Sequence, residues 1–361
     1  MRRVTKHHPR TYFFDDKSLF GLDIGHDTLR VMQFELGRKG MPRLMGYGSA
    51  VFDPAAIVNG VIVKPEFVAK AATALFRKGL VGRITTNRVA VSLPVGRAFT
   101  RAVQLPKMGA ADIAEAVHTE TEQYVPASID TLYIDYTVLR EDDEGMEVFV
   151  VAMPKQIVDS YLTLTRMLGL EAVLFDTAIG ASAQMFARDK QSDVPAVLVD
   201  FGAQSTDITV FNHGLVVTGS VAFGGDDTTA TISKRLTVTP HEAMMLKSKY
   251  GLSSSAVQKQ MTTVLEPSLT LLIKEIRRAI RYYEQRYFKE PPIGQVVIMG
   301  GGANMPGLAD YLMDQLRLPV RPFDPAFHID FGQLHPFYSA ERMSYVTAAG
   351  LAITNPAEIF A

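Results

Sequence analysis

The chain has 361 residues, 47% of them hydrophobic, and a formal net charge of −1, so it is long enough for two domains with a substantial core. The near-neutral charge argues against nucleic acid as the main partner, because proteins that bind it usually carry a strongly basic surface. Cysteine is absent, which excludes disulfides and cysteine-ligated zinc or iron–sulfur sites. No run of about 18 apolar residues occurs, so we expect no membrane-spanning helix.

The first 17 residues form a basic leader with no apolar stretch after it, which argues against a secretory signal. Two interpretations of this leader stay open. It is either an unstructured tail or a segment that contacts an anionic membrane or a partner.

The first half of the chain reads as an α/β lobe with a small insertion. Its periodicity predicts strands, a glycine turn and a helix in this order: strands within 19–34 and at 43–52, a helix at 67–78 and a buried strand at 88–93. The insertion is expected to run helix, strand, strand, helix, at 111–124, 134–139, 148–153 and 155–168, with an acidic turn at 141–145. A connecting helix rich in small residues is then predicted at 176–187.

The second lobe starts near Val197. It is expected to contain a strand at 215–221, helices that begin at 224 and 239, a long amphipathic helix at 265–287, a strand at 296–299 and a helix through 316. The long helix carries Arg277, Arg278, Arg281 and Arg286, which raises the question of a nucleic-acid surface. Glutamates interleave with these arginines, which favours a solvated helix face.

The same short pattern occurs once in each half. Asp23-Ile-Gly25 and Asp200-Phe-Gly202 both end an apolar run, and hydroxyl residues follow each glycine. Asp-x-Gly alone is a common turn, so one copy would be weak evidence. Two copies indicate two similar halves whose turns clamp the phosphates of one nucleotide, with both aspartates directed at magnesium. A pair of buried aspartates without a metal is the alternative.

A third glycine cluster, Gly300-Gly301-Gly302, follows a strand-like run and precedes a helical pattern. Successive glycines let the backbone lie close to a ligand, as the adenosine part of a nucleotide requires.

The order of these signals resembles the actin-like ATPase superfamily. Three stretches resemble the inserted subdomain of its PilM and FtsA branch: Leu105-Pro106, 122–126 and 133–136. Three more are most similar to PilM: 223–228, 275–283 and 348–352. The resemblance covers about residues 19 to 354 and implies a bilobed α/β fold with an inserted subdomain of the FtsA/PilM type. FtsA proteins end in a membrane-binding amphipathic helix, for which the stretch from 354 to 361 is too short.

The resemblance also implies domain boundaries. Residues 1–17 are the leader, 18–95 and 167–187 the core of lobe one, and 96–166 the inserted subdomain. Residues 188–230 and 291–361 form the core of lobe two, and 231–290 its helical subdomain.

The resemblance further implies ATP and Mg²⁺ as cofactors and a set of site residues. Asp23 and Asp200 would hold the metal, and Asp176 would act near the water that attacks the γ-phosphate. The nucleotide would be bound by Gly25, His26, Asp27, Thr28, Gly202, Gln204, Ser205, Thr206, Gly224, Gly225, Lys247, Gly300, Gly301, Gly302 and Asn304.

Three positions depart from the family pattern. His26 stands where a small residue is usual, Met244 where a glutamate is common, and Gly219 where an arginine is frequent. These departures bear on nucleotide affinity and on hydrolysis more than on the fold.

The resemblance implies a cytoplasmic component of type IV pilus assembly, peripheral at the inner membrane through its partner, with weak ATPase activity left open. That partner is the N-terminal segment of a PilN-like inner-membrane protein, in a groove drawn from 91–105 and 124–136; other platform proteins and self-association stay open. The alternatives are a phosphotransferase of sugar-kinase type and an FtsA-like filament-forming division protein. No sugar-kinase signature occurs, and type II secretion uses related modules.

Overall fold

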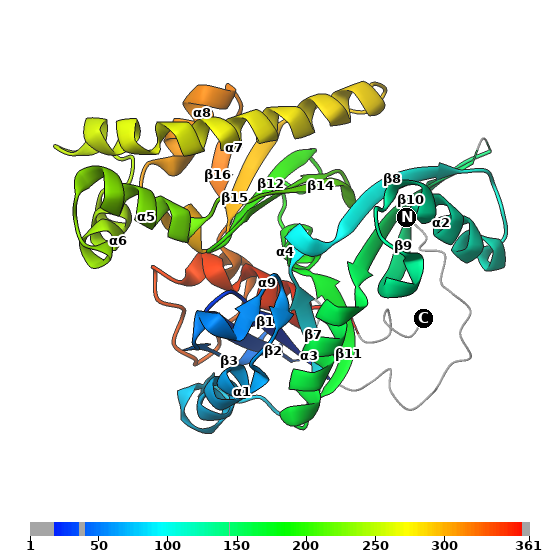
Figure 1. Cartoon of the computed structure of the whole chain (residues 1–361), viewed down its shortest axis with the longest axis horizontal. Helices are drawn as coiled ribbons and strands as arrows, with labels where there is room; N and C mark the ends of the chain where they lie inside the picture. Colours follow the sequence, from blue (N-terminus) through cyan, green and yellow to red (C-terminus); the bar gives the residue numbers. More distant parts are fainter. Residues whose placement is uncertain (1–17, 36–39, 144, 356–361) are drawn as a thin grey trace. The chain divides into compact units, whose positions relative to one another are not determined.

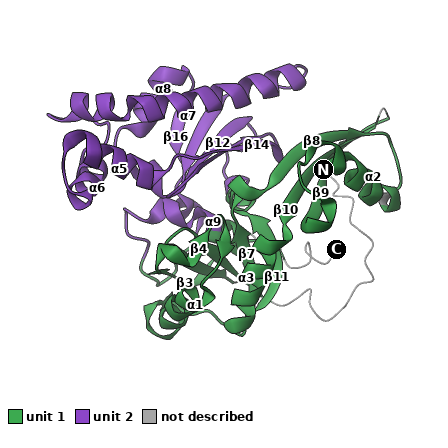
Figure 2. Ribbon diagram, in the orientation of Figure 1, with its two compact units in different colours: residues 1–184, 330–335, 348–361 green, residues 185–329, 336–347 purple. Residues whose placement is uncertain are grey.

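The computed structural model describes residues 18–35, 40–143 and 145–355. Its chain divides into two compact units, which Figure 2 shows in different colours. Unit 1 takes residues up to 184 together with 330–335 and the chain from 348, and unit 2 takes 185–329 and 336–347. The leader at 1–17, the stretch 356–361 and residue 144 of the acidic turn lie outside the described residues.

Unit 1 is built on a six-stranded sheet in the order β11-β7-β1-β2-β3-β6 (Figure 1). The parallel strands are β1 (Phe20–Ile24), β7 (Arg88–Leu93) and β11 (Glu171–Thr177). Strands β2 (Thr28–Phe34), β3 (Leu44–Val51) and β6 (Val81–Gly82) continue from β1 as an antiparallel meander. Because these three neighbouring strands are parallel, their carboxyl ends lie at one edge of the sheet, where ligands of open α/β sheets bind.

Helices cover both faces of this sheet. Helices α1 (Pro65–Ala74) and α3 (Lys155–Met167) pack on one face, where alternate residues of β1 such as Phe20 and Leu22 join their core. Helices α4 (Ala178–Phe186) and α9 (Val346–Ala352) supply Ala181 and Leu351 to the cluster on the other face. A methyl group on Gly350 would collide with the carbonyl of Ala181, so glycine permits these two helices to touch.

A three-stranded antiparallel sheet, β8-β10-β9, forms the rest of unit 1. Its strands are β8 (Phe99–Leu105), β9 (Leu132–Glu141) and β10 (Met146–Pro154), and α2 (Ala110–Tyr124) packs on them through Ile113 and Val117. Two short strands, β4 (Ile57–Val58) and β5 (Val61–Ile62), make a separate hairpin.

Unit 2 repeats the topology of the unit 1 sheet. Its strand order is β14-β13-β12-β15-β16. Strands β12 (Ala196–Phe201), β13 (Thr206–Phe211) and β14 (Leu215–Val221) form an antiparallel meander, and β15 (Gln295–Met299) and β16 (Val320–Pro322) extend it in parallel from β12. Three antiparallel strands followed by two parallel ones also form the order β3-β2-β1-β7-β11, so the prediction of two similar halves is confirmed.

The helices of unit 2 are α5 (Gly225–Leu236), α6 (Pro240–Lys249), α7 (Gln258–Arg286) and α8 (Leu308–Leu316). Helix α7 runs along the sheet (Figure 1), and its buried side chains join the core of unit 2. The structure contains no helix, among the residues described, that is both long and apolar enough to cross a membrane.

Three predictions of secondary structure were wrong. Helix α7 begins at Gln258 rather than at 265, because Pro267, which favours a helix start, lies inside the helix. Strand β8 was missed, and the insertion therefore has three strands. Asp176 was assigned to the connecting helix, but it lies in β11. The helix begins only after Thr177, whose hydroxyl oxygen accepts a hydrogen bond from Gly180 N–H at 3.1 Å.

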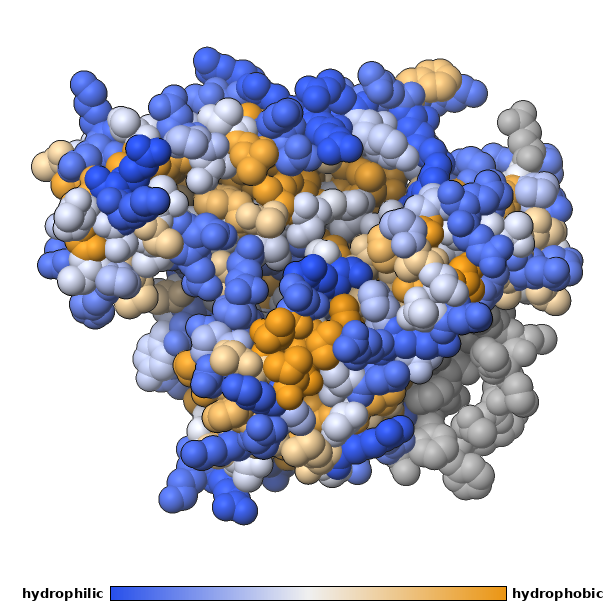
Figure 3. Space-filling model, in the orientation of Figure 1, coloured by the Kyte–Doolittle hydropathy of each residue, from blue (hydrophilic) through white to orange (hydrophobic). Residues whose placement is uncertain are grey.

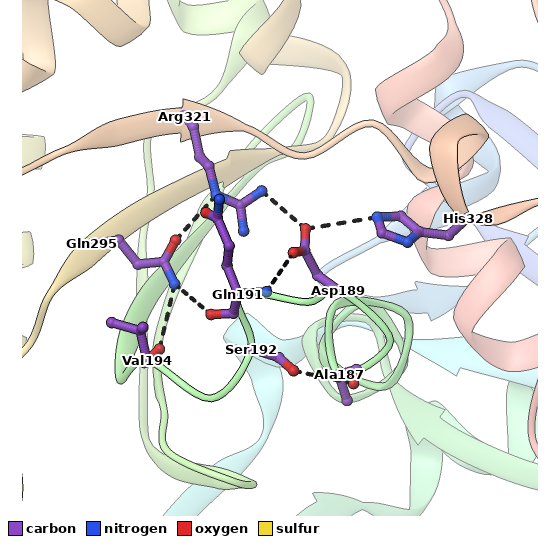
Figure 4. A network of polar contacts seen from close by, with 8 residues as sticks. All are labelled: Ala187, Asp189, Gln191, Ser192, Val194, Gln295, Arg321 and His328. Atoms are coloured by element: carbon purple, nitrogen blue, oxygen red, sulfur yellow. Dashed lines mark hydrogen bonds and ion pairs between the residues drawn. The ribbon is translucent and has the colours of Figure 1, made fainter.

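A polar network fixes the segment that follows α4 to the end of the unit 2 sheet (Figure 4). Asp189 Oδ2 lies 3.0 Å from Arg321 Nη1 and 3.6 Å from His328 Nε2. Arg321 Nε donates to Gln295 Oε1 at 3.0 Å, and Gln295 Nε2 donates to the carbonyl of Gln191 at 2.8 Å. Side chains of β15, β16, the loop after α4 and the turn at His328 are therefore joined in one network.

Candidate functional site

The two Asp-x-Gly patterns form the same turn. In unit 1, Gly25 N–H donates to the carbonyl of Thr28 at 2.9 Å, and in unit 2, Gly202 N–H donates to the carbonyl of Ser205 at 2.9 Å. A side chain on either glycine would crowd the same carbonyl. Each turn joins a strand that ends just after an aspartate to the antiparallel strand that pairs with it. The repeat in the sequence is therefore a repeat in backbone geometry.

The turn of unit 1 places the predicted residues in one short loop. His26 and Asp27 lie in the turn and are partly exposed. The hydroxyl of Thr28 donates to Asp27 Oδ1 at 2.8 Å, so this hydroxyl is engaged within the loop.

A row of polar side chains crosses the unit 1 sheet beside this turn. Asp23 accepts a hydrogen bond from Ser92 Oγ at 2.7 Å, and its strand register pairs it with Arg30 of β2. Burial raises the pKa of Asp23, and the charge of Arg30 and the Ser92 hydroxyl act in the opposite direction. On the other side, Ser92 is the register partner of Asp176. Because neighbouring strands bring paired residues to the same face, the row joins the two predicted acids.

Asp176 is held at the carboxyl end of β11. Its Oδ1 accepts from Thr177 N–H at 2.7 Å, and its Oδ2 accepts from Gln184 Nε2 at 2.9 Å. Burial raises the pKa of Asp176 to about 6, although these hydrogen bonds lower it. Gln184 Oε1 in turn accepts from the Thr354 hydroxyl at 3.0 Å. The carboxyl group is thus ionised at neutral pH and can take up a proton under mildly acidic conditions.

The corresponding row in unit 2 contains two acids. Asp200 of β12 pairs with Asp207 of β13, at the register that joins Asp23 to Arg30 in unit 1. Burial raises the pKa of Asp207 to about 6, and a hydrogen bond with Ser220 opposes the shift. Its Oδ1 atom is buried without a hydrogen-bond partner among the described residues. An orphaned carboxylate oxygen next to a second carboxylate is a suitable environment for a cation.

The glycine pair at the start of α5 supports the second turn. Gly225 N–H donates to the carbonyl of Gly202 at 3.0 Å, and Asp226 N–H to that of Ala203 at 2.9 Å. Gly224 N–H donates to Asp227 Oδ2 at 3.0 Å. These amides are occupied by the protein, so this helix start holds the turn in place.

Thr206 strengthens the same contact, because its hydroxyl donates to the carbonyl of Phe223 at 2.7 Å. Gln204 and Ser205 stay at the turn, with Gln204 exposed.

A small cavity of about 20 Å³ lies beside the glycine pair, within unit 2. It is lined by Phe201, Phe223, Gly224, Gly225, Thr228, Lys247, Leu265, Leu269, Gly302, Met305 and Leu308. Most of this lining is apolar, and Lys247 supplies its charge. Lys247 Nζ donates to the Gly225 carbonyl and to Thr229 Oγ1, each at 2.8 Å, and burial lowers the pKa of Lys247. The lining is apolar as in small-molecule sites, and the enclosed space has the size of a water molecule.

The third glycine cluster closes the end of β12. Gly300 has φ of +80°, and a side chain there would collide with Asp200 Oδ1 and the Phe201 carbonyl. Asn304 Nδ2 donates to the carbonyl of Gly301 at 3.1 Å, which keeps the loop turned. The third cluster therefore lies directly against the second acidic motif.

The departures from the family pattern occupy different environments. Met244 is exposed on α6 and is not among the cavity residues, whereas Met305 is. Gly219 lies in β14 with open space where a side chain would begin.

The structure thus brings the predicted residues together in two sets. The unit 1 set is Asp23, Gly25, His26, Asp27, Thr28 and Asp176, and the unit 2 set is Asp200, Gly202, Gln204, Ser205, Thr206, Gly224, Gly225, Lys247, Gly300, Gly301, Gly302 and Asn304. Sequence reasoning missed Arg30, Ser92, Gln184 and Asp207. Arg30 and Asp207 each follow their motif aspartate by seven residues, a spacing that an antiparallel hairpin with this turn would have revealed.

Two residues of the expected partner groove have a structural role. Tyr124 and Tyr136 pack against the core of the three-stranded sheet. Tyr133 on the opposite face of β9 is 45% exposed, and its hydroxyl donates to Asp159 Oδ1 at 3.1 Å. A partner that meets the exposed face of this strand would contact Tyr133 before the two partly buried rings of Tyr124 and Tyr136.

Comparison with known proteins agrees with this architecture. The chain is 22% identical over 354 residues to the cell division protein FtsA of Pseudomonas aeruginosa, covering 84% of this chain and 82% of that protein. A solved PilM–PilN type IV pilus biogenesis complex matches with a TM-score of 0.79 and 24% identity, over 93% of this chain and 98% of the other. MreB5 of Spiroplasma citri bound to ADP matches with a TM-score of 0.54 and 13% identity, over 93% and 95%.

These structural matches confirm the predicted actin-like ATPase fold. The family described as "Type IV pilus assembly protein PilM" matches residues 21–355, nearly the whole chain. The chain therefore belongs to the PilM family of type IV pilus assembly proteins.

Proposed function

We propose that this chain is an ATP-binding component of the type IV pilus assembly platform, which binds the N-terminal segment of a PilN-like inner-membrane protein. The observation that carries the nucleotide part is the repeated turn, with an acid at the same register in both units. The nucleotide's phosphates would meet the backbone of the two turns, and the base would lie against the residues that line the small cavity beside Lys247. Gly300 to Gly302 and Asn304 would border the adenosine.

Magnesium is part of this proposal. Asp23 and Asp200 would hold it, and the unpartnered oxygen of Asp207 beside Asp200 supports a cation at the unit 2 acids. A bound magnesium ion would neutralise charge on the phosphates. The chain's own contribution is to fix the acids by strand pairing and to keep Asp23 in place through Ser92.

Asp176 is the candidate for slow hydrolysis. Its carboxylate is ionised at neutral pH and is oriented by Thr177 and Gln184, as a base that positions a water would need. The proposed activity is weak, and a sugar-kinase-type phosphotransferase or an FtsA-like filament protein remains the alternative.

The partner is proposed from charge and from the solved complex of a similar protein. Residues 96–154 contain eleven acidic and four basic residues, a net charge of −7 in a chain of −1. A basic, extended segment would complement this surface. The proposed inserted subdomain, 96–166, would bind it, and the protein would stay in the cytoplasm, peripheral to the membrane through that partner.

The test is calorimetric titration with Mg-ATP, followed by titration of the loaded protein with the N-terminal peptide of the PilN-like protein from the same source. Asp200→Ala should abolish the magnesium dependence of ATP binding, while Asp193→Ala, an exposed acid in the loop before β12, should keep it. Tyr133→Ala should lower the affinity for the peptide at least tenfold and leave the affinity for ATP unchanged.

Each outcome separates the alternatives. ATP binding without peptide binding would favour the kinase or filament interpretation. Peptide binding without ATP would make the protein a purely structural adaptor and would remove the nucleotide part of the proposal.

A further inference from the structure

The second half of α7 presents a cationic and aromatic face. Its buried residues, among them Leu272, Ile276 and Tyr283, face the core of unit 2. The opposite face is exposed and follows helical spacing: Leu271, Lys274, Arg278, Arg281, Tyr282 and, just past the helix end, Phe288 and Lys289. We name these seven residues the α7 face. They lie towards the upper right end of α7 in Figure 1.

This face combines charge with exposed apolar area. Phe288 is 77% exposed, Leu271 44% and Tyr282 40%. In Figure 3 the surface over this end of α7 is mostly hydrophilic with a small apolar area within it. Lys289 Nζ lies 5.8 Å from the centre of the Phe288 ring, so a positive charge accompanies the most exposed aromatic side chain.

Residues 274–289 contain six basic and two acidic residues, a local charge of +4. One of the acids, Glu275, is 3.4 Å from Arg278, and Arg277 is engaged with the carbonyl of Gln315 at 2.6 Å. Within the described part of the chain, Lys274, Arg281 and Lys289 have no hydrogen bond or ion pair through their side chains. The positive charge is therefore not consumed by the helix itself.

An anionic lipid surface complements both the charge and the apolar area of this face, whereas a nucleic acid complements only the charge. Basic side chains around an amphipathic helix bind acidic headgroups, and an exposed aromatic ring enters the boundary between headgroups and acyl chains. A nucleic acid would use the charges but would leave the apolar area of Phe288 and Leu271 in water. We propose that the α7 face binds the surface of a bilayer that contains anionic phospholipid. This contact goes beyond the proposed function, in which a protein partner carries the membrane association.

The experiment is sedimentation of the full chain with vesicles that contain phosphatidylglycerol, compared with vesicles of phosphatidylcholine alone, in the absence of any pilus protein. Binding is expected only to the anionic vesicles, and salt should weaken it because screening shortens the reach of surface charges. Arg281→Glu should lower vesicle affinity about thirty-fold, the equivalent of about 2 kcal/mol for reversing one charge near the surface. Phe288→Ala should lower it several-fold at unchanged net charge.

Lys259→Glu is the matched control, because Lys259 is an exposed base near the other end of the same helix, about 33 Å from Arg281 along the helix axis. It should bind vesicles like the unmodified chain. Equal loss in Lys259→Glu and Arg281→Glu would overturn the proposal, because binding would then depend on overall charge. Equal sedimentation with both vesicle types, no sedimentation with either, or an unchanged affinity of Phe288→Ala would overturn it as well. The circular dichroism spectrum of each variant establishes that its fold is intact.

Discussion

Replacing Asp176 by asparagine should stabilise unit 1 at neutral pH. The folded pKa of Asp176 is about 6, against an ordinary value of 3.8, because burial disfavours the charged carboxylate. Below pH 3.8 the carboxyl group is protonated in the folded and the unfolded chain, so its burial does not lower the free energy of unfolding. As the pH rises from 3.8 to 6 the unfolded chain ionises first, and the free energy of unfolding falls. The difference of about 2.2 pKa units corresponds to about 3 kcal/mol at pH 7.5 and about 1 kcal/mol at pH 4.5. Since Asp176 keeps some solvent exposure, these values are upper bounds.

The hydrogen bonds around Asp176 can adapt to the amide. Gln184 can rotate its amide so that Oε1 accepts from the new Nδ2 group, and the Thr354 hydroxyl can accept from Gln184 Nε2. The substitution thus removes the charge while leaving the pairing of the three side chains intact.

Urea denaturation of both proteins at pH 7.5 and pH 4.5, followed by circular dichroism, measures the effect. Asp176→Asn should gain free energy of unfolding at pH 7.5 and much less at pH 4.5, and Asp193→Asn should gain none. Two results would contradict this reasoning: a lower free energy of unfolding for the variant at pH 7.5, or an equal gain at both pH values. Either would show that ionising the buried Asp176 carboxyl does not destabilise the fold. Because the same carboxylate is the proposed base, the variant should also lose ATP hydrolysis while retaining ATP affinity.

Two further predictions concern unit 2. Gly300→Ala should destabilise the unit by about 2 kcal/mol or more, because the residue has φ of +80° and the new methyl group collides with Asp200; Gly219→Ala, with open space around it, should have little effect, and a similar loss of thermal stability in both would refute the reasoning. Lys247→Met should lower ATP affinity about tenfold, since it removes the charge and both donors but keeps most of the stem. Lys249→Met serves as its exposed control in calorimetry, and unchanged affinity in Lys247→Met would exclude this lysine from the base site.

The two Asp-x-Gly turns and the glycine cluster could be predicted from the sequence, because residues close together in the chain determine their backbone geometry. The Asp-x-Gly turns were predictable because the glycine N–H and the carbonyl three residues later lie in one turn. The glycine cluster at 300–302 was predictable for the same reason. The metal-binding, nucleotide-binding and catalytic roles of these residues stay predictions.

The neighbours of these turns were not predictable from local sequence. Ser92 reaches Asp23 across 69 positions, and Gln184 reaches Asp176 only because Thr177 ends the strand and starts α4 one residue later. Arg30 and Asp207 required the strand register. The start of α7 was predicted seven residues too late, and Pro267 lies inside the helix, where side chains such as Leu265 and Leu269 are buried.

The network of Asp189, Arg321 and His328 has a mechanical consequence. The chain passes between the units at 184/185, 329/330, 335/336 and 347/348, and Asp189 and His328 lie within a few residues of the first two crossings. Asp189 contacts both Arg321 and His328, so the stretches next to these two crossings are tied to each other within unit 2. A displacement of either stretch is therefore transmitted to the other through a single carboxylate.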